Sequence, residues 1–384
     1  MQEFETKLNE TIEAGKMLAA IAVVADVDGK TVYRHSAGKQ NLEPNAPSVD
    51  PNSTVMLGSA GKFITHIAAI QCVERSLIGL DDPAAIEKHL PEVAALKVYL
   101  PSDDEPGFIL REPTKKITLR HLLTHSSGIS YPGDEKLEKW TQSDKPAIDE
   151  NAHIIVKIFS MPLLHEPGEG WTYGSSVEWV GLLILRLTGL RLVEFVQKNI
   201  FDALDMKMST YYPEKHAEIW AKKLQMVNRE SGVLVAEPDD TVQGLTCSVG
   251  DLQTLLVDLL GQSKLLSQPY VDEIFKPQFV RGTPTYVGVR EDIRKLGKSV
   301  GVPTTLANPP VNASLAALFV EDGVAPLSNF PPGTLTWSGM PNVIWAVNRE
   351  KGKAAIFATQ LLPVEDDEII AVAMSFMRGA WKSH

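Results

Sequence analysis

Both ends of the chain contain a pair of strand-like segments, and this arrangement constrains the fold most. Near the start, residues 17–25 and 30–35 are separated by the hairpin-turn sequence Asp26-Val27-Asp28-Gly29. Near the end, residues 343–348 and 354–360 are almost continuously apolar, which is typical of strands buried on both faces. Helices are expected between the two pairs. We therefore expect an α+β fold in which both chain termini build one antiparallel sheet, helices flank it, and the middle region is mostly helical.

We expect one domain that spans residues 1–384. About residues 1–58 and 241–384 are expected in the sheet layer, and about residues 59–240 in the helical layer. No internal repeat or low-complexity linker divides the sequence.

Two stretches lack a clear hydrophobic period. Residues 97–116 are rich in Pro, Asp and Lys, and we expect a loop there. Residues 280–313 are rich in Gly, Pro and Val, so they either line a pocket or form a surface loop.

Composition and charge narrow the classes of partner. With 37 Lys and Arg against 48 Asp and Glu, the net charge is −11, which argues against nucleic acid or an anionic membrane as a partner. The two cysteines, Cys72 and Cys247, form no disulfide framework or zinc pattern, and a reducing compartment is the simpler interpretation. The N-terminal residues lack the apolar core of a signal peptide, and no apolar run reaches about 18 residues. We predict a cytoplasmic protein without membrane association, unless a leader has been removed.

The segment Ser59-Ala60-Gly61-Lys62 has the spacing of a serine nucleophile and an amine one helical turn apart. Helical spacing of apolar residues continues to about residue 78, beginning with Phe63, Ile67, Ile70 and Val73. Amides at a helix N-terminus favour a developing anion. A serine hydroxyl needs a neighbouring base. A lysine is that base only if its pKa falls from about 10.4 to about 7–8, which requires roughly 4 kcal/mol of bias against the ammonium.

The same tetrapeptide also occurs as Ser36-Ala37-Gly38-Lys39. That copy follows a strand-like run, and Pro44 and Pro47 interrupt the polar segment after it, so no helix places its serine and lysine on one face. We interpret it as the end of a strand. Helical context therefore distinguishes Ser59 from Ser36. The tetrapeptide alone is equally consistent with an N-cap serine and a solvated lysine.

Two further segments carry chemically active side chains. Residues 167–176 form a glycine-rich loop before a long apolar helix, and Tyr173 in this loop is a rigidly placed phenol. His121 and His125 are four residues apart, as metal-binding histidines can be, but no third ligand accompanies them. We expect these histidines to hydrogen-bond the end of a short helix, and we expect neither a metal nor another cofactor.

Four segments, in this order, resemble the serine β-lactamase and penicillin-binding-protein superfamily, nearest its class C-like esterase branch. They are Ser59-x-x-Lys62, His121 to Gly128, Tyr173-Gly174-Ser175 in the place of Tyr-x-Asn, and Trp337-Ser338-Gly339 in the place of Lys-Thr-Gly. Each segment is weak alone, but together they cover most of the chain and are specific. The run from Trp337 to Asn342 is most similar to the fungal group that contains the lovastatin side-chain acyltransferase.

The resemblance implies a β-lactamase/transpeptidase-like fold and a role for each matching residue. Ser59 would carry the acyl group. Lys62 would lower the pKa of Tyr173, share its proton or act as the base, and Tyr173 would deprotonate the incoming alcohol or water. The backbone amides of Ser59 and Met340 would form the oxyanion hole. The residues that would contact the substrate are Ser175, Trp337, Ser338 and Gly339.

The departures from the family pattern bear on the substrate. Where β-lactam enzymes have a lysine that helps to hold a carboxylate, this chain has Trp337, which offers an apolar wall. We therefore expect serine-dependent acyl transfer, rather than β-lactam hydrolysis, from a thioester or ester donor to a hydroxyl of a small apolar metabolite. An acyl carrier protein is a candidate carrier of the donor. The alternatives are a carboxylesterase with the same residues and an inactive binding member of the family, against which the intact Ser59, Lys62 and Tyr173 argue.

Overall fold

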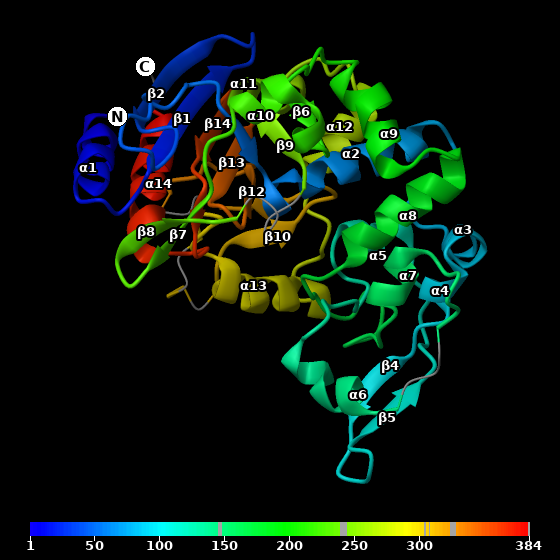
Figure 1. The fold of residues 1–384 in the computed structure, drawn as a ribbon. Helices are drawn as coiled ribbons and strands as arrows, with labels where there is room; N and C mark the ends of the chain where they lie inside the picture. Colours follow the sequence, from blue (N-terminus) through cyan, green and yellow to red (C-terminus); the bar gives the residue numbers. More distant parts are fainter. Residues whose placement is uncertain (145–147, 239–243, 303–304, 307, 323–327, 383–384) are drawn as a thin grey trace.

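The computed structural model describes residues 1–144, 148–238, 244–302, 305–306, 308–322 and 328–382. A seven-stranded antiparallel sheet lies on the left in Figure 1, and most helices lie on the right. In spatial order its strands are β10 (Val311–Ala313), β11 (Leu318–Val320), β12 (Leu335–Gly339), β13 (Val343–Asn348), β14 (Lys353–Ala358), β1 (Ala19–Asp26) and β2 (Thr31–Gly38). Because β1 pairs with β14, both chain termini build one sheet, and the predicted α+β fold is confirmed.

Helices cover the sheet on both faces. On one face, α1 (Gln2–Glu13) and α14 (Asp367–Ala380) lie side by side (Figure 1), and Phe4 of α1 packs against Phe357 of β14. On the opposite face, Trp345 of β13 packs against Phe63 of the helix that follows Ser59. Strands β13 and β14 are buried almost throughout for this reason, as their apolar sequences predict.

The mostly helical middle region is organised around α2 (Lys62–Glu74) and α8 (Ser176–Thr188), which pack against each other. Around them lie α3 (Pro83–His89), α4 (Pro91–Ala94), α5 (Leu119–Leu123), α6 (Glu138–Gln142), α7 (Ile154–Phe159) and α9 (Leu192–Val196). Nearer the sheet lie α10 (Ala217–Ala221), α11 (Val249–Asp258), α12 (Gln268–Ile274) and α13 (Pro284–Leu296). No described helix is long and apolar enough to cross a bilayer.

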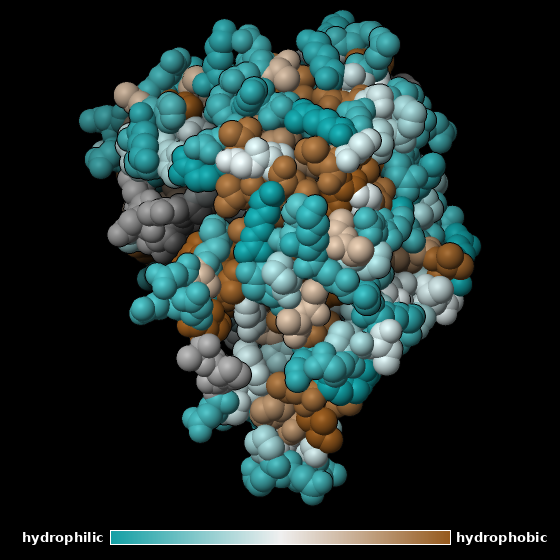
Figure 2. Space-filling view, turned by 90° about the vertical axis from the view of Figure 1, so that its right-hand side faces the viewer, coloured by the Kyte–Doolittle hydropathy of each residue, from teal (hydrophilic) through white to brown (hydrophobic). Residues whose placement is uncertain are grey.

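Short strands complete the structure. They are β3 (Thr54–Met56), β6 (Ser209–Thr210) and β9 (Thr246–Ser248) in one small sheet, β7 (Val227–Glu230), β8 (Val233–Ala236) and β15 (Leu361–Leu362) in a second, and the hairpin β4 (Val98–Pro101) and β5 (Phe108–Arg111). The hairpin projects from the lower end of the molecule, where Figure 2 shows exposed apolar atoms on an otherwise largely polar face.

Several local predictions differ from the structure. The predicted loop at residues 97–116 contains the β4–β5 hairpin. Residues 280–313 contain α13 and β10 and line the cleft described below through Ile293, Ser299 and Val300, so the pocket-lining alternative is confirmed, while 303–304 and 307 lie outside the described residues. Helix α2 ends at Glu74 instead of near residue 78, because Ser76 adopts a left-handed conformation (φ +57°). The predicted layer boundary at residue 241 lies outside the described residues, and the single-domain assignment stays a prediction.

Candidate active site

Ser59 lies on a tight turn between a strand and a helix. Strand β3 ends at Met56, residues Gly58–Gly61 form one turn of 3-10 helix, and α2 begins at Lys62. Ser59 and Lys62 therefore lie on consecutive helical turns, as their spacing predicts. The second copy of the tetrapeptide behaves differently: Ser36 lies within β2, opposite Ile21 of β1.

The sheet holds this turn in place through two buried side chains. The indole N–H of Trp345 donates a hydrogen bond of 2.9 Å to the carbonyl oxygen of Ala60. The Gln360 side chain accepts a hydrogen bond from the Met56 amide (2.9 Å) and donates one to the Met56 carbonyl (3.0 Å). Because unmade hydrogen bonds of buried groups are costly, these contacts fix the position of the turn relative to the sheet.

The segment after β12 packs directly on the same turn. A Cβ atom on Gly339 would lie 1.9 Å from the carbonyl oxygen of Leu57, so only glycine fits there. A Cβ atom on Gly58 (φ +52°) would lie 3.0 Å from the amide nitrogen of Met340. The main chain of Met340 is therefore adjacent to the turn that carries Ser59, while the Met340 side chain is 46% exposed.

Tyr173 is placed by the glycine that follows it. A Cβ atom on Gly174 would lie 2.1 Å from the carbonyl oxygen of Ile129, so this loop packs backbone to backbone. The Tyr173 ring lies between aromatic neighbours, with centroid distances of 4.8 Å to His125 and 5.3 Å to Trp337. The Tyr173 hydroxyl is buried and has no hydrogen-bond partner within the part of the chain that the structure describes.

Lys62 has an acidic partner that we did not predict. Its Nζ lies 2.6 Å from Oε1 of Glu178, in the first turn of α8, and both side chains are largely buried. The Tyr131 hydroxyl donates to the same carboxylate oxygen (3.2 Å), and the Tyr131 ring centroid lies 5.7 Å from the Lys62 ammonium. Burial raises the pKa of Tyr131, and its neighbours Tyr173 and Glu178 raise it further, so this phenol is a neutral donor.

The Lys62–Glu178 pair bears on which group acts as base. A carboxylate 2.6 Å from an amine stabilises the ammonium form, and an ammonium has no lone pair with which to accept a proton. Lys62 is thus held against Glu178, and it lines the smaller cavity described below and is not among the residues that line the cleft with Ser59 and Tyr173.

A cleft of about 280 Å³ brings most of the predicted site residues together. The predicted residues that line it are Ser59, Tyr173, Trp337, Ser338, Gly339 and Met340. Three residues of the segment 280–313, for which pocket lining was one predicted alternative, also line it, namely Ile293, Ser299 and Val300. Val364 and Glu365, which we did not predict, complete the lining. The cleft combines a nucleophile and a phenol with mainly apolar walls, as sites for small organic ligands commonly do.

Ser175, predicted to contact the substrate, does not line this cleft. It is fully buried at the start of α8, and its hydroxyl donates to the carbonyl oxygen of Ser130 (2.9 Å). His121 also has a local role, since its Nδ1 accepts a hydrogen bond from the Thr118 amide (3.2 Å) at the start of α5. Ser175 therefore acts on the site only through the position of the Tyr173 loop.

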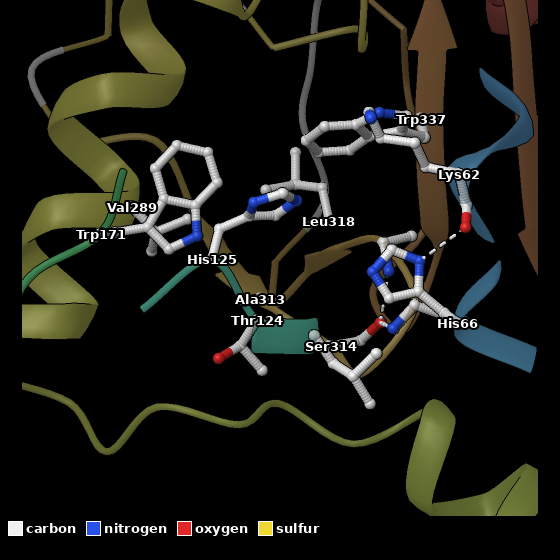
Figure 3. Close-up of a pocket in the computed structure, with 13 residues that line it drawn as sticks. Lys62, His66, Thr124, His125, Trp171, Val289, Ala313, Ser314, Leu318 and Trp337 are labelled. Atoms are coloured by element: carbon white, nitrogen blue, oxygen red, sulfur yellow. Dashed lines mark hydrogen bonds between the residues drawn. The ribbon is translucent and has the colours of Figure 1, made fainter. Parts of the chain in front are cut away.

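A smaller apolar cavity of about 20 Å³ lies behind the cleft, and Trp337 lines both spaces. Figure 3 shows the His125 ring in this cavity between Trp171 and Leu318, with His66 on the Lys62 side. Burial lowers the pKa of His66 to about 4 and that of His125 well below its usual value. Both histidines are therefore neutral at pH 7, and among the residues that line this cavity the charge comes from Lys62.

Comparisons with known proteins agree with this geometry. The Beta-lactamase family matches residues 8–374. The acyltransferase calJ of Penicillium decumbens is 30% identical over 369 residues, which cover 92% of this chain and 86% of the relative. The lovastatin esterase of Penicillium rubens is 29% identical and covers 99% of this chain and 98% of its own length.

Solved structures give the same grouping. The simvastatin synthase LovD of Aspergillus terreus, in its LovD6 mutant, superimposes with a TM-score of 0.85 at 26% identity, covering 98% of this chain and 93% of that chain. The hydrolase EstCE1, described as having promiscuous acyltransferase activity, has a TM-score of 0.73 at 15% identity and covers 98% of both chains, which supports the fold alone. The chain therefore belongs to the beta-lactamase family, in the group of serine acyltransferases and esterases that its sequence resembles.

Proposed function

We propose that this enzyme moves an acyl group from a thioester or ester donor, through an acyl-Ser59 intermediate, to a hydroxyl of a small, largely apolar metabolite. The observation that carries the proposal is the cleft in which Ser59, Tyr173 and the main chain of Met340 meet. Relatives named acyltransferase and methylbutanoyltransferase support transfer as the reaction class.

In the first step, the Ser59 oxygen attacks the carbonyl carbon of the donor, and the Ser59 proton passes to the Tyr173 phenolate. The negative charge that develops on the carbonyl oxygen is stabilised by the amides of Ser59 and Met340, each worth roughly 3 kcal/mol. The carbon–sulfur bond of a thioester donor then breaks, and the departing thiolate takes the proton from Tyr173.

In the second step, Tyr173 takes the proton of the acceptor hydroxyl. The acceptor oxygen attacks the acyl carbon, the bond to Ser59 breaks, and Ser59 recovers the proton from Tyr173. Lys62, held as an ammonium by Glu178, stabilises the Tyr173 phenolate in both steps. Tyr131 holds Glu178 in place by donating to the same oxygen.

The lining of the cleft supports an uncharged substrate. Trp337 gives an apolar wall that also faces the inner cavity, while Ser338 and Gly339 form the strand edge beside Ser59. A carrier-protein thioester is one form of the donor in this proposal. A cytoplasmic location also belongs to it, supported by Cys72 and Cys247, which are both free and buried.

A carboxylesterase is the second candidate, because the lovastatin esterase is among the relatives. The two reactions share the acyl-Ser59 intermediate and differ in whether water or an alcohol reaches it first. Feeding a thioester with and without alcohols separates them. Rapid hydrolysis that no alcohol suppresses would mean that the enzyme is a carboxylesterase.

The chemistry is tested by intact-mass spectrometry after a brief pulse of the butanoyl thioester of N-acetylcysteamine. We expect one added butanoyl mass that maps to Ser59 and is absent in Ser59→Ala. The chain supplies a matched control, since Ser36→Ala changes the serine of the identical tetrapeptide within β2 and should label normally. Labelling that persists in Ser59→Ala would exclude the proposal.

A second variant tests the phenol. We expect Tyr173→Phe to fold normally and to lose most of the acylation rate, roughly 10²–10⁴-fold for a general base. The neighbouring Tyr131 hydroxyl keeps its hydrogen bond to Glu178 when the Tyr173 hydroxyl is removed, so no donor is left unpaired there. An unchanged acylation rate would remove Tyr173 from the mechanism.

A further inference from the structure

One wall of the cleft carries an acidic side chain that the steps above do not use. Glu365 lines the same cleft as Ser59 and Tyr173. Its Oε1 accepts hydrogen bonds from the Ser299 hydroxyl (3.0 Å) and the Ser299 amide (3.5 Å). The Ser338 hydroxyl donates to the Ser299 hydroxyl (3.0 Å), so a chain of hydrogen bonds runs along the cleft from β12 to this carboxylate.

The main chain at Glu365 is held in a conformation that few non-glycine residues adopt. Its φ is +62°, in the left-handed region. Asn342 fixes this conformation: its Oδ1 accepts from the Glu365 amide (3.3 Å), and its Nδ2 donates to the carbonyl oxygen of Leu361 (2.7 Å). Asn342 also closes the turn after Gly339. The strained main chain at Glu365 is thus tied to the turn that presents the Met340 amide. Backbone strain of this kind concentrates at functional sites.

Among the residues that the structure describes, Glu365 has no ion-pair partner. The Lys298 ammonium pairs with Asp367 at 2.7 Å, and its pKa is raised mainly by Asp367 and further by Glu365. That pair and Glu365 together leave one negative charge at this end of the cleft. Within the described part of the chain, Oε2 of Glu365 makes no hydrogen bond, while a carboxylate accepts several.

We propose that Glu365 selects the acceptor by accepting a hydrogen bond from a second hydroxyl of the alcohol that is acylated. The preferred acceptors are then uncharged diols or polyols, and hydroxy acids are disfavoured because their carboxylate meets the Glu365 charge in a partly desolvated cleft. This inference rests on the proposed function, since it needs an acyl-Ser59 that an alcohol discharges. Glu365 makes and breaks no bond, and is a specificity-determining residue.

The test measures how fast matched alcohols discharge acyl-Ser59 formed from the butanoyl thioester. The acceptors are cyclohexanol, the three positional isomers of cyclohexanediol, and a hydroxycyclohexanecarboxylate. We expect at least one diol to exceed cyclohexanol in kcat/KM by about 10- to 100-fold, the range of a hydrogen bond to a charged group, after correction for its two hydroxyls. The hydroxy acid should be slower than cyclohexanol.

Two variants of Glu365 separate charge from shape. In Glu365→Gln, the amide oxygen still accepts from Ser299, so the loop keeps its position while the charge is lost. The diol-to-cyclohexanol ratio should fall several-fold, and the hydroxy acid should gain relative to cyclohexanol. In Glu365→Ala, the ratio should approach one. The matched control is Glu368→Gln, which removes one negative charge three residues away and outside the cleft lining, from a side chain that pairs with Lys16 and Arg229 and leaves the Lys298–Asp367 pair intact, and it should keep the diol preference.

The outcomes distinguish this inference from the proposed function. If no acyl adduct forms on Ser59, the proposed function is wrong, and this inference is then wrong as well. If the adduct forms and cyclohexanol discharges it, but no diol is preferred or the preference survives in Glu365→Ala, acyl transfer stands and the selection by Glu365 is wrong. Each ratio is taken within one variant, so a change in folded fraction does not affect it.

Discussion

Gly339→Ala tests whether the main chain of Met340 must touch the Ser59 turn. The added Cβ would lie 1.9 Å from the Leu57 carbonyl oxygen, whereas ordinary contact begins at 3.4 Å, so the two segments must separate by 3.4 − 1.9 = 1.5 Å. A misplacement of about 1 Å costs roughly 10²-fold in rate, and loss of one oxyanion donor costs roughly 10²–10³-fold. We therefore expect acylation of Ser59 to slow by about 10²–10³-fold.

The assay is the acylation rate from quenched time points, with thermal unfolding of the same sample. Gly181→Ala in α8 is the matched control, because its Cβ would meet only the flexible Leu192 side chain at 3.3 Å, and we expect nearly normal rates. If Gly339→Ala fails to fold, Gly58→Ala applies a smaller clash, 3.0 Å from the Met340 amide nitrogen. Acylation within about threefold of the parent, in a variant that melts normally, would refute the reasoning about this contact.

Three further predictions concern the groups around this contact. Glu178→Gln should slow acylation by about 10- to 100-fold, which is the range for a lost charge-assisted hydrogen bond. The loss should be larger than in Tyr131→Phe, which removes one donor to the same carboxylate. If Glu178→Gln is instead faster at neutral pH, neutral Lys62 is the base. Trp345→Phe should lose about 1–3 kcal/mol more stability in urea than Trp179→Phe, because both remove a buried indole but only Trp345 donates a hydrogen bond, to Ala60. His66 has a folded pKa of about 4 against 6.5 in the unfolded chain, so the unfolded state binds more protons between these values. Neutral His66 therefore contributes about 3 kcal/mol to the free energy of unfolding above pH 6.5, and this contribution is lost as the pH falls towards 4. Urea titrations across this pH range should show the loss, and the loss should be smaller in His66→Gln.

The sheet could be predicted from the strand pairs at the two chain ends, because the hydrophobic pattern of each strand lies within a few neighbouring residues and is strong. Continuous apolar runs such as residues 343–348 predict buried strands whatever surrounds them. The secondary structure predicted for polar segments was wrong where tertiary contacts determine it. The β4–β5 hairpin lies in a stretch rich in Pro and charge. Helix α2 ends at Glu74, just before Ser76 takes a left-handed conformation in which glycine is the usual residue.

Candidate catalytic residues could be proposed from the sequence where a spacing or a family pattern marked them, as for Ser59, Lys62 and Tyr173, and their roles stay predictions. Glu178 was missed because an acidic residue in the first turn of a helix is ordinary and is fully explained by the helix dipole. Its one available signal was its position five residues after Tyr173, in the same segment as the phenol. Glu365 gave no signal, because only the folded chain shows a non-glycine residue with φ +62° beside the cleft.

The role of Lys62 follows from a single packing contact. Lys62 starts α2, while the loop with Tyr173 and the helix with Glu178 form one continuous segment that packs on α2 through α8. The Glu178 carboxylate therefore reaches Lys62 from the same segment that carries Tyr173, and the contact between α2 and α8 sets the distance between Glu178 and Lys62. A Ser-x-x-Lys spacing leaves the ionisation of its lysine open, because the partner comes from 116 residues further along the chain. Here that partner is a carboxylate, and in the proposed mechanism the ion pair gives Lys62 the part of a fixed charge and Tyr173 the part of the proton carrier.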